Sequence, residues 1–152
     1  MKSAHEVQGP RIPPERCWSL LDRTRVGRIA TLDGDQPLVV VVPFALDQGD
    51  IVIGAKAGSG LSGLWGREVA FEVDDIDAGT EAGWSVVVRG PAYDVTDTVD
   101  RRSERLQGVD VSCWCMDGVD GRIVIRPREV SGHWLRAPQP RNAQLMQFAA
   151  QR

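Results

Sequence analysis

The sequence predicts a mainly β protein, an antiparallel barrel of six or seven strands with short helices. Apolar residues recur at every second position in several short runs, which is the periodicity of half-buried strands. Turn signals that contain Gly, Asp or Pro separate these runs at short intervals, as in strands joined by hairpins. Three segments with helical spacing accompany the strands, and this mixture is typical of a small barrel.

The composition favours one globular domain. The chain has 152 residues, of which 42% are hydrophobic and 26% charged, and these values are ordinary for a globular protein. A formal charge of −3 gives no electrostatic reason to expect a nucleic acid or a membrane as partner. No run approaches the roughly 20 apolar residues that span a bilayer. Three cysteines, an odd number, favour free thiols and a cytoplasmic location.

The centre of the predicted fold is a long hairpin within Glu68–Asp97. Its two strands contain Val69–Val73 and Trp84–Val88, and an acidic link with two glycines joins them. In the first strand Val69, Phe71 and Val73 share one face, and in the second Trp84, Val86 and Val88 do. We expect these faces to line the core.

The remaining elements pack around this hairpin. A helix begins at Pro13-Pro14 and carries an apolar stripe that includes Cys17. Residues 37–46 are apolar on both faces, so we expect both to be covered, with a bulge or strand edge at Pro43. A second helix, capped by Asp97 or Thr98, should turn Val99, Ser103 and Leu106 inward and end at Gly108. Further strands are predicted at 27–32, 51–55, 122–126 and 130–135, a loop at 108–121 and a small helix at 143–150.

The segment Lys56–Gly66 follows a strand and is rich in glycine. We expect a loop that opens into a short helix capped by Ser59 or Ser62. Backbone N–H groups of such a loop, with the Ser59 hydroxyl and the Lys56 charge, suit a phosphate. A flexible connector is the alternative interpretation.

Other chemistries find little support. The two histidines, and the absence of a Gly-x-Ser-x-Gly elbow, disfavour a hydrolase. Cys113-x-Cys115 does not have zinc-ligand spacing, and we expect free thiols there. The acidic turn at Asp74–Asp77 is interpreted as solvated, so no metal site is predicted.

The order of the parts resembles the pyridoxamine 5′-phosphate oxidase-like flavin-binding proteins, in particular the small actinobacterial and nitroimidazole-reductase-like branch. The resemblance covers roughly residues 14–135, and its most specific piece is Phe71–Asp77 with Gly83–Gly90. The other matching pieces are Trp18–Leu21, Gly27–Thr31, Val42–Phe44, the Lys/Gly/Ser loop, Arg122–Pro127 and Val130–Gly132. It implies a split β-barrel over residues 14–136, between a flexible N-terminus (1–13) and a tail (137–152). It also implies a homodimer with one FMN in each of two clefts at the interface.

The resemblance also implies a cofactor site. Lys56, Ser59 and Gly60 would form the phosphate cradle. Three residues of one strand, Val42, Pro43 and Phe44, would lie beside the flavin ring. Trp84 and Ser85 begin the strand that resembles the flavin-facing one, but they point in opposite directions and cannot both face one flavin from one subunit. No catalytic residue is assigned.

The expected function is that of an FMN-dependent oxidoreductase acting on a small molecule, with NAD(P)H as a candidate electron donor. A non-enzymatic flavin-binding or sensor module is the alternative, as is a relative that uses F420 or haem. The chain is shorter than true pyridoxamine phosphate oxidases and lacks their Arg-Leu-x-Pro ending. Oxidation of vitamin B6 is therefore not expected.

Overall fold

The computed structural model describes residues 9–136. Most of the predicted flexible N-terminus and the whole predicted C-terminal tail, including its small helix, lie outside this range. Within it, seven strands and two helices follow one another along the chain. They are α1 (Pro14–Leu21), β1 (Val26–Asp33), β2 (Gln36–Asp47), β3 (Asp50–Ala55), β4 (Trp65–Asp77), β5 (Ala82–Asp94), α2 (Arg101–Gln107), β6 (Gly121–Ile125) and β7 (Glu129–Arg136).

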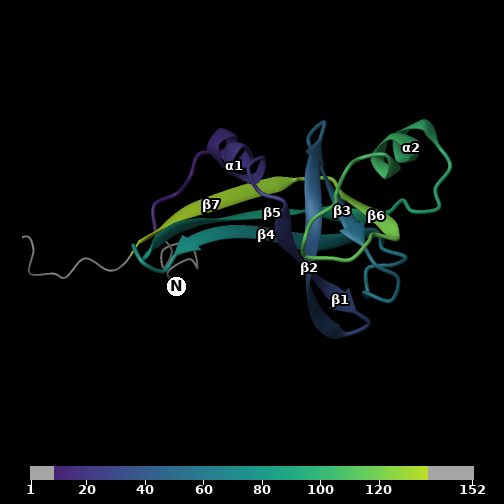
Figure 1. Cartoon of the computed structure of the whole chain (residues 1–152), viewed down its shortest axis with the longest axis horizontal. Coiled ribbons are helices and arrows are strands. Elements are labelled where there is room, and N and C mark those ends of the chain that lie inside the picture. The colour runs from purple at the N-terminus through teal and green to yellow at the C-terminus, as the bar shows by residue number, and fades with distance from the viewer. Residues whose placement is uncertain (1–8, 137–152) are drawn as a thin grey trace, which may run out of the picture.

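The strands form the predicted antiparallel barrel. Their order is β4-β1-β2-β3-β6-β5, and pairing of β4 with β5 closes the ring of six. β7 pairs with the part of β5 that precedes Gly90, whereas the end of β5 pairs with β6. Figure 1 shows α1 above the end where β4, β5 and β7 extend, and α2 at the other end beside β3 and β6.

The barrel is split between β1 and β4. These two strands pair only at Arg28–Ala30 with Ala70–Glu72. Beyond this contact β1 continues in register with β2, while the start of β4 continues with β5. The two strands therefore separate, and the wall opens where Leu32 and Arg67 face each other.

The core confirms the predicted inward faces of the central hairpin. Val69, Phe71, Val73, Trp84, Val86 and Val88 are all buried. Phe71 packs edge-to-face on Phe44, with ring centroids 4.9 Å apart. Gly27 leaves room for this ring, since a Cβ there would lie 2.4 Å from Cζ of Phe71. Both the hairpin and the predicted first helix, whose Cys17, Leu20 and Leu21 are buried, are as expected.

Two turns differ from the prediction. The central hairpin has only residues 78–81 between its strands, because the acidic residues up to Asp77 belong to β4. Asp77 accepts hydrogen bonds from the N–H groups of Gly79 and Thr80, which stabilises this short turn. The helix expected after Lys56 is absent from the described residues, because Gly58, Gly60 and Gly63 adopt positive φ angles that no α-helix contains.

The second helix starts later than predicted. Asp100, not Asp97 or Thr98, is the N-cap, and its carboxylate accepts from the N–H groups of Arg102 and Ser103. Val99 therefore precedes the helix and is 88% exposed, whereas Ser103 and Leu106 are buried as expected. Gly108 is the predicted C-cap.

Strand β2 changes partner at Pro43. Its first part pairs with β1 up to Pro43, and its second part pairs with β3 from Phe44 onward. In the second part Phe44 and Ala45 are buried, but in the first part Val39 and Val41 are 64% and 50% exposed in the single chain. The prediction that both faces are covered is therefore wrong for the first part of this strand within one chain.

The cysteines also differ from expectation. Cys113 and Cys115 are joined by a disulfide in the predicted loop, so they are not free thiols here. Cys17 is free and buried. In the part of the chain that the structure describes, no helix is long and apolar enough to cross a membrane.

Candidate functional site

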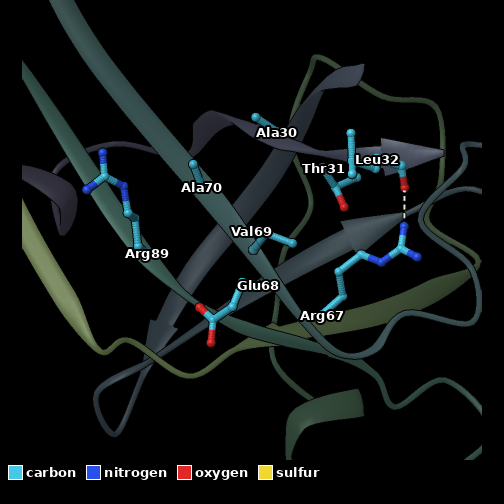
Figure 2. A pocket seen from close by; sticks show the side chains of 8 residues that line it. All are labelled: Ala30, Thr31, Leu32, Arg67, Glu68, Val69, Ala70 and Arg89. Atoms are coloured by element: carbon cyan, nitrogen blue, oxygen red, sulfur yellow. Dashed lines mark hydrogen bonds between the residues drawn. The ribbon is translucent and has the colours of Figure 1, made fainter. Parts of the chain in front are cut away.

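A groove lies where β1 and β4 separate, and we call it the split groove. Its volume is about 620 Å³, within the range of about 300–1,000 Å³ that is usual for small-molecule pockets. The small side chains of Ala30 and Ala70, which face each other across the two strands, leave its floor apolar. Figure 2 shows all the residues that line it, which are Ala30, Thr31, Leu32, Arg67, Glu68, Val69, Ala70 and Arg89.

Arginines lie at both ends of the split groove (Figure 2). Nη1 of Arg67 donates a 2.7 Å hydrogen bond to the carbonyl oxygen of Leu32. At the other end, Arg89 forms a 3.4 Å ion pair with Glu129. Both arginines are exposed, so an anionic group that enters the groove meets a positive charge at either end.

Thr31 also lines the groove, but its side chain lies on the inner face of β1, opposite to that of Ala30. Thr31 is 8% exposed, and its Oγ1 has no hydrogen-bond partner among the described residues. This oxygen is itself buried on the inner face of β1, so it is not exposed to a ligand in the groove. The groove thus combines an apolar floor with two arginines and the carboxylate of Glu68.

The glycine-rich loop borders the same region. A hollow of about 270 Å³ shares Leu32 and Arg67 with the split groove and is also lined by Gly60, Ser62, Gly63 and one acidic residue, Asp33. Gly60 adopts a φ of +80°, and a Cβ there would lie 2.6 Å from Cδ2 of Leu38. Only glycine therefore allows the loop to lie this close to β2.

Lys56 lies on the other side of this loop. It lines a separate hollow of about 290 Å³ together with three carboxylates, those of Asp94, Asp97 and Asp120. The predicted cradle is thus divided, because Lys56 and Gly60 line different hollows. The third predicted member, Ser59, has a buried hydroxyl without a partner in the described part of the chain.

Two of these carboxylates already bind N–H groups of the loop. Asp120 accepts from the N–H of Ala57 at 3.0 Å, and Asp94 accepts from the N–H of Gly63 at 2.8 Å. Burial alone would raise the pKa of Asp94, but hydrogen bonds from Thr96 and Gly63 lower it overall. The hollow beside Lys56 is therefore anionic and disfavours phosphate.

The three β2 residues of the predicted site belong to the interior. Val42, Pro43 and Phe44 are buried, and the N–H of Phe44 donates to the carbonyl oxygen of Arg25. None of the three side chains lines the split groove.

Trp84 and Ser85 lie at the far end of the hairpin. They point to opposite faces, as predicted, with Trp84 buried and Ser85 donating to Oε1 of Glu72 at 3.2 Å. Asp94, which the glycine-rich loop contacts, lies about 33 Å further along β5 at about 3.3 Å per residue. The structure therefore does not bring Trp84 and Ser85 to the loop within one chain.

Glu72 belongs to a charged cluster on the same outer face as Ala70. Arg28 donates to Glu72 and Asp74 at 3.1 and 3.3 Å. Burial, with the neighbouring charge of Asp74, raises the pKa of Glu72. This carboxyl can therefore hold a proton at a higher pH than an ordinary glutamate, one pleat away from the groove floor.

Sequence reasoning did not find Arg67 or the Glu72 cluster. A signal for Arg67 was present, because it precedes Val69, Phe71 and Val73 at the same spacing. A charged residue at an inward position of a strand marks either an error in the assigned register or an opening in the wall. Here the wall opens.

Comparisons with known proteins agree with this architecture. The family model described as pyridoxamine 5′-phosphate oxidase matches residues 13–134. The FAD-binding protein from Mycobacterium smegmatis is 25% identical, with a TM-score of 0.65 over 84% of this chain and 98% of that one. An FAD-binding protein from Mesorhizobium loti is 21% identical, with a TM-score of 0.63 over 82% and 96%. The FAD and haem-binding protein from M. smegmatis is 16% identical, with a TM-score of 0.60 over 89% and 78%. None of the curated proteins matches this chain.

Proposed function

The chain belongs to the pyridoxamine 5′-phosphate oxidase family, and from this premise we propose that it is an FMN-binding oxidoreductase acting on a small molecule. The observation that carries the proposal is the split groove, with its apolar floor and its arginines. Two similar structures are named as FAD-binding proteins, which supports a flavin as the class of ligand. F420 and haem are the alternative cofactors.

The residues of the groove fit a flavin phosphate ester. Ala30 and Ala70 would lie against the isoalloxazine. Arg67, beside Gly60 of the glycine-rich loop, would bind the phosphate. Lys56, Ser59, Val42, Pro43 and Phe44 are then supporting residues of the loop and of the core. The bound flavin would supply the hydride chemistry.

We also propose that a second copy of the chain completes the site. Val39 and Val41 lie on the outer face, opposite Ala30 and Arg28 in register, and are therefore continuous with the groove floor. Together with Leu32, which is 47% exposed, they leave an apolar surface uncovered in one chain. A two-fold dimer would cover these residues and enclose the open side of each groove. It would also allow Ser85 of the partner to approach a flavin that the first subunit holds, whereas Trp84 belongs to the core of its own chain.

Stopped-flow reduction tests the enzymatic part of the proposal. The flavin-loaded protein is mixed with NADH or NADPH under anaerobic conditions, and flavin absorbance is followed. Rapid bleaching, followed by recovery when an electron acceptor is added, is the expected result. If the flavin binds tightly but no donor reduces it, the non-enzymatic flavin-binding module replaces the oxidoreductase.

Vitamin B6 oxidation is not part of this proposal. The family name refers to that reaction, but the sequence printed here contains no Arg-Leu-x-Pro motif, and we do not propose it for this chain. Incubation with pyridoxamine 5′-phosphate, with product formation followed by absorbance, is expected to show no turnover.

A further inference from the structure

The loop between α2 and β6 carries a disulfide between residues that are only two positions apart. Cys113 and Cys115 form the bridge, and Trp114 between them is 92% exposed. Both cysteines are partly exposed to solvent. The bridge is therefore accessible to a reagent in solution, and a large aromatic side chain lies next to it.

This disulfide contributes little to holding the fold together. Both of its cysteines belong to the same loop, and the entropy that a cross-link removes from the unfolded chain is smallest for a short loop. Other contacts already hold both arms of the loop. Val111 is 2% exposed in the second hydrophobic cluster, and Asp120 accepts from the N–H of Ala57. Stabilisation of the fold therefore does not explain why this disulfide is present.

The local geometry favours cleavage of the bridge with Cys113 as the leaving group. The N–H of Cys115 donates to Sγ of Cys113 over 3.0 Å. A hydrogen bond of this kind stabilises negative charge on the sulfur, and a better-stabilised thiolate leaves faster in thiol–disulfide exchange. Sγ of Cys115 is then the atom that an incoming thiolate attacks.

We propose that Cys113 and Cys115 form a reversible redox site that exchanges two electrons with a dithiol reductant. A thiolate of the reductant attacks Sγ of Cys115, and Cys113 leaves as a thiolate that takes up a proton. The second thiol of the reductant, as a thiolate, then attacks the reductant's first sulfur, which is bonded to Cys115 in the mixed disulfide. Cys115 is released as a thiolate and takes up a proton in turn. The protein disulfide and the dithiol thus become a protein dithiol and a reductant disulfide. This proposal does not depend on flavin binding.

Cys17 provides an internal control in the same chain. It lies on α1, fully buried against Gly132, and its Sγ contacts the carbonyl oxygen of Ile12 at 3.6 Å. Burial raises the pKa of this thiol, which keeps it protonated and unreactive in the folded protein. It should react with an alkylating reagent only after unfolding.

The test is a redox titration of the whole protein. Samples are equilibrated in mixtures of reduced and oxidised dithiothreitol, quenched with acid and alkylated with N-ethylmaleimide, and the modified residues are located by mass spectrometry. Circular dichroism of each sample shows whether the fold is retained. We expect Cys113 and Cys115 to become modified together as reductant increases, Cys17 to remain unmodified, and the bridge to return in excess oxidised dithiothreitol.

Two results would overturn the proposal. One is that both thiols stay modifiable in excess oxidised dithiothreitol, since the bridge then does not form. The other is that the bridge survives excess reduced dithiothreitol in the folded protein and opens only in urea.

Single variants test the order of attack. In Cys115→Ala the backbone N–H of residue 115 remains to support Cys113, whereas in Cys113→Ala the thiol of Cys115 lacks such a donor. We expect the first variant to react with oxidised glutathione at neutral pH several times faster than the second. Equal rates would contradict the role assigned to Cys113 as the leaving group.

Discussion

Arg67 joins β4 to β1 at the point where the two strands no longer pair, through the hydrogen bond from its Nη1 to the carbonyl oxygen of Leu32. This bond holds the guanidinium at the end of the split groove, beside the glycine-rich loop. Within residues 9–136 it is the single hydrogen bond found for this side chain, and arginine has five N–H donors. Arg67 is therefore oriented in advance and still able to bind an anion.

Substitution of Arg67 should weaken FMN binding. We expect Arg67→Ala to cost about 1–3 kcal/mol, the range for charge-assisted hydrogen bonds. Lys56→Ala should cost less, because Lys56 lies among carboxylates. Titration calorimetry measures both affinities, with Arg23→Ala as a control at an exposed arginine outside the groove. A larger loss of FMN affinity for Lys56→Ala than for Arg67→Ala would indicate that the phosphate binds on the Lys56 side of the loop.

A charge on the outer face of β2 should prevent dimer formation. Val39 is 64% exposed and adjoins the groove floor, so Val39→Glu would place a carboxylate in the proposed interface. Sedimentation velocity at micromolar concentration should show a dimer for the natural chain and a monomer for the variant. The dimer should bury well over about 1,000 Å² in total. Val99→Glu, at an exposed valine before α2, should remain dimeric, and a natural chain that sediments as a monomer would refute the shared site.

The close contact between Gly27 and Phe71 predicts a coupled effect on stability. Gly27→Ala should lower the free energy of unfolding by about 1–3 kcal/mol, because its Cβ would overlap the Phe71 ring. Phe71→Leu removes the overlapping ring atoms and opens a void, so it also destabilises. The cost of Gly27→Ala should be smaller in the Phe71→Leu background, as urea denaturation of the double-mutant cycle would show. Strictly additive costs would contradict the contact.

The raised pKa of Glu72 predicts a pH dependence of stability. Burial, followed by the charge of Asp74, moves this pKa above its ordinary value of 4.5, so the folded state binds the proton more tightly than the unfolded state. The contribution of Glu72 to the stability of the folded state is complete when the pH is below that ordinary value, and it is lost as the pH rises through the folded-state pKa. Urea denaturation should therefore show Glu72→Gln gaining stability relative to the natural chain as the pH rises through this window.

Asp77 provides a comparison of opposite sign. Hydrogen bonds from Thr80 and Gly79 lower its pKa, so its contribution to stability is present above the ordinary value and lost as the pH falls. Asp77→Asn should therefore gain relative stability as the pH falls. If both variants changed in the same direction with pH, the assigned causes of the two pKa shifts would be wrong.

The sequence predicted the strands well because their faces are strongly patterned. Val69, Phe71 and Val73 alternate with small or charged residues, and burial of one face of β4 requires that alternation. The turns were less predictable. Four glycines after Lys56 are compatible with either a loop or a weak helix, and only the backbone angles in the folded chain decide between them.

The candidate site could be predicted only in part. The glycine-rich loop is a local signal, and its Gly60 lines the hollow that shares Leu32 and Arg67 with the groove. The groove itself arises from the separation of β1 and β4, which depends on long-range pairing that no local pattern encodes. For the same reason, nothing near Lys56 in the sequence indicates that Asp94 and Asp120 bind the N–H groups of its loop.

The central claim is that the split groove holds a flavin phosphate ester, and a binding titration tests it most directly. The purified protein is titrated with FMN, FAD, riboflavin, F420 and haem, and the absorbance and fluorescence of each ligand are followed. The account predicts saturable binding of one FMN per chain, weaker binding of riboflavin, and a selective loss of FMN affinity in Arg67→Ala. Absence of saturable binding for every flavin tested would contradict it.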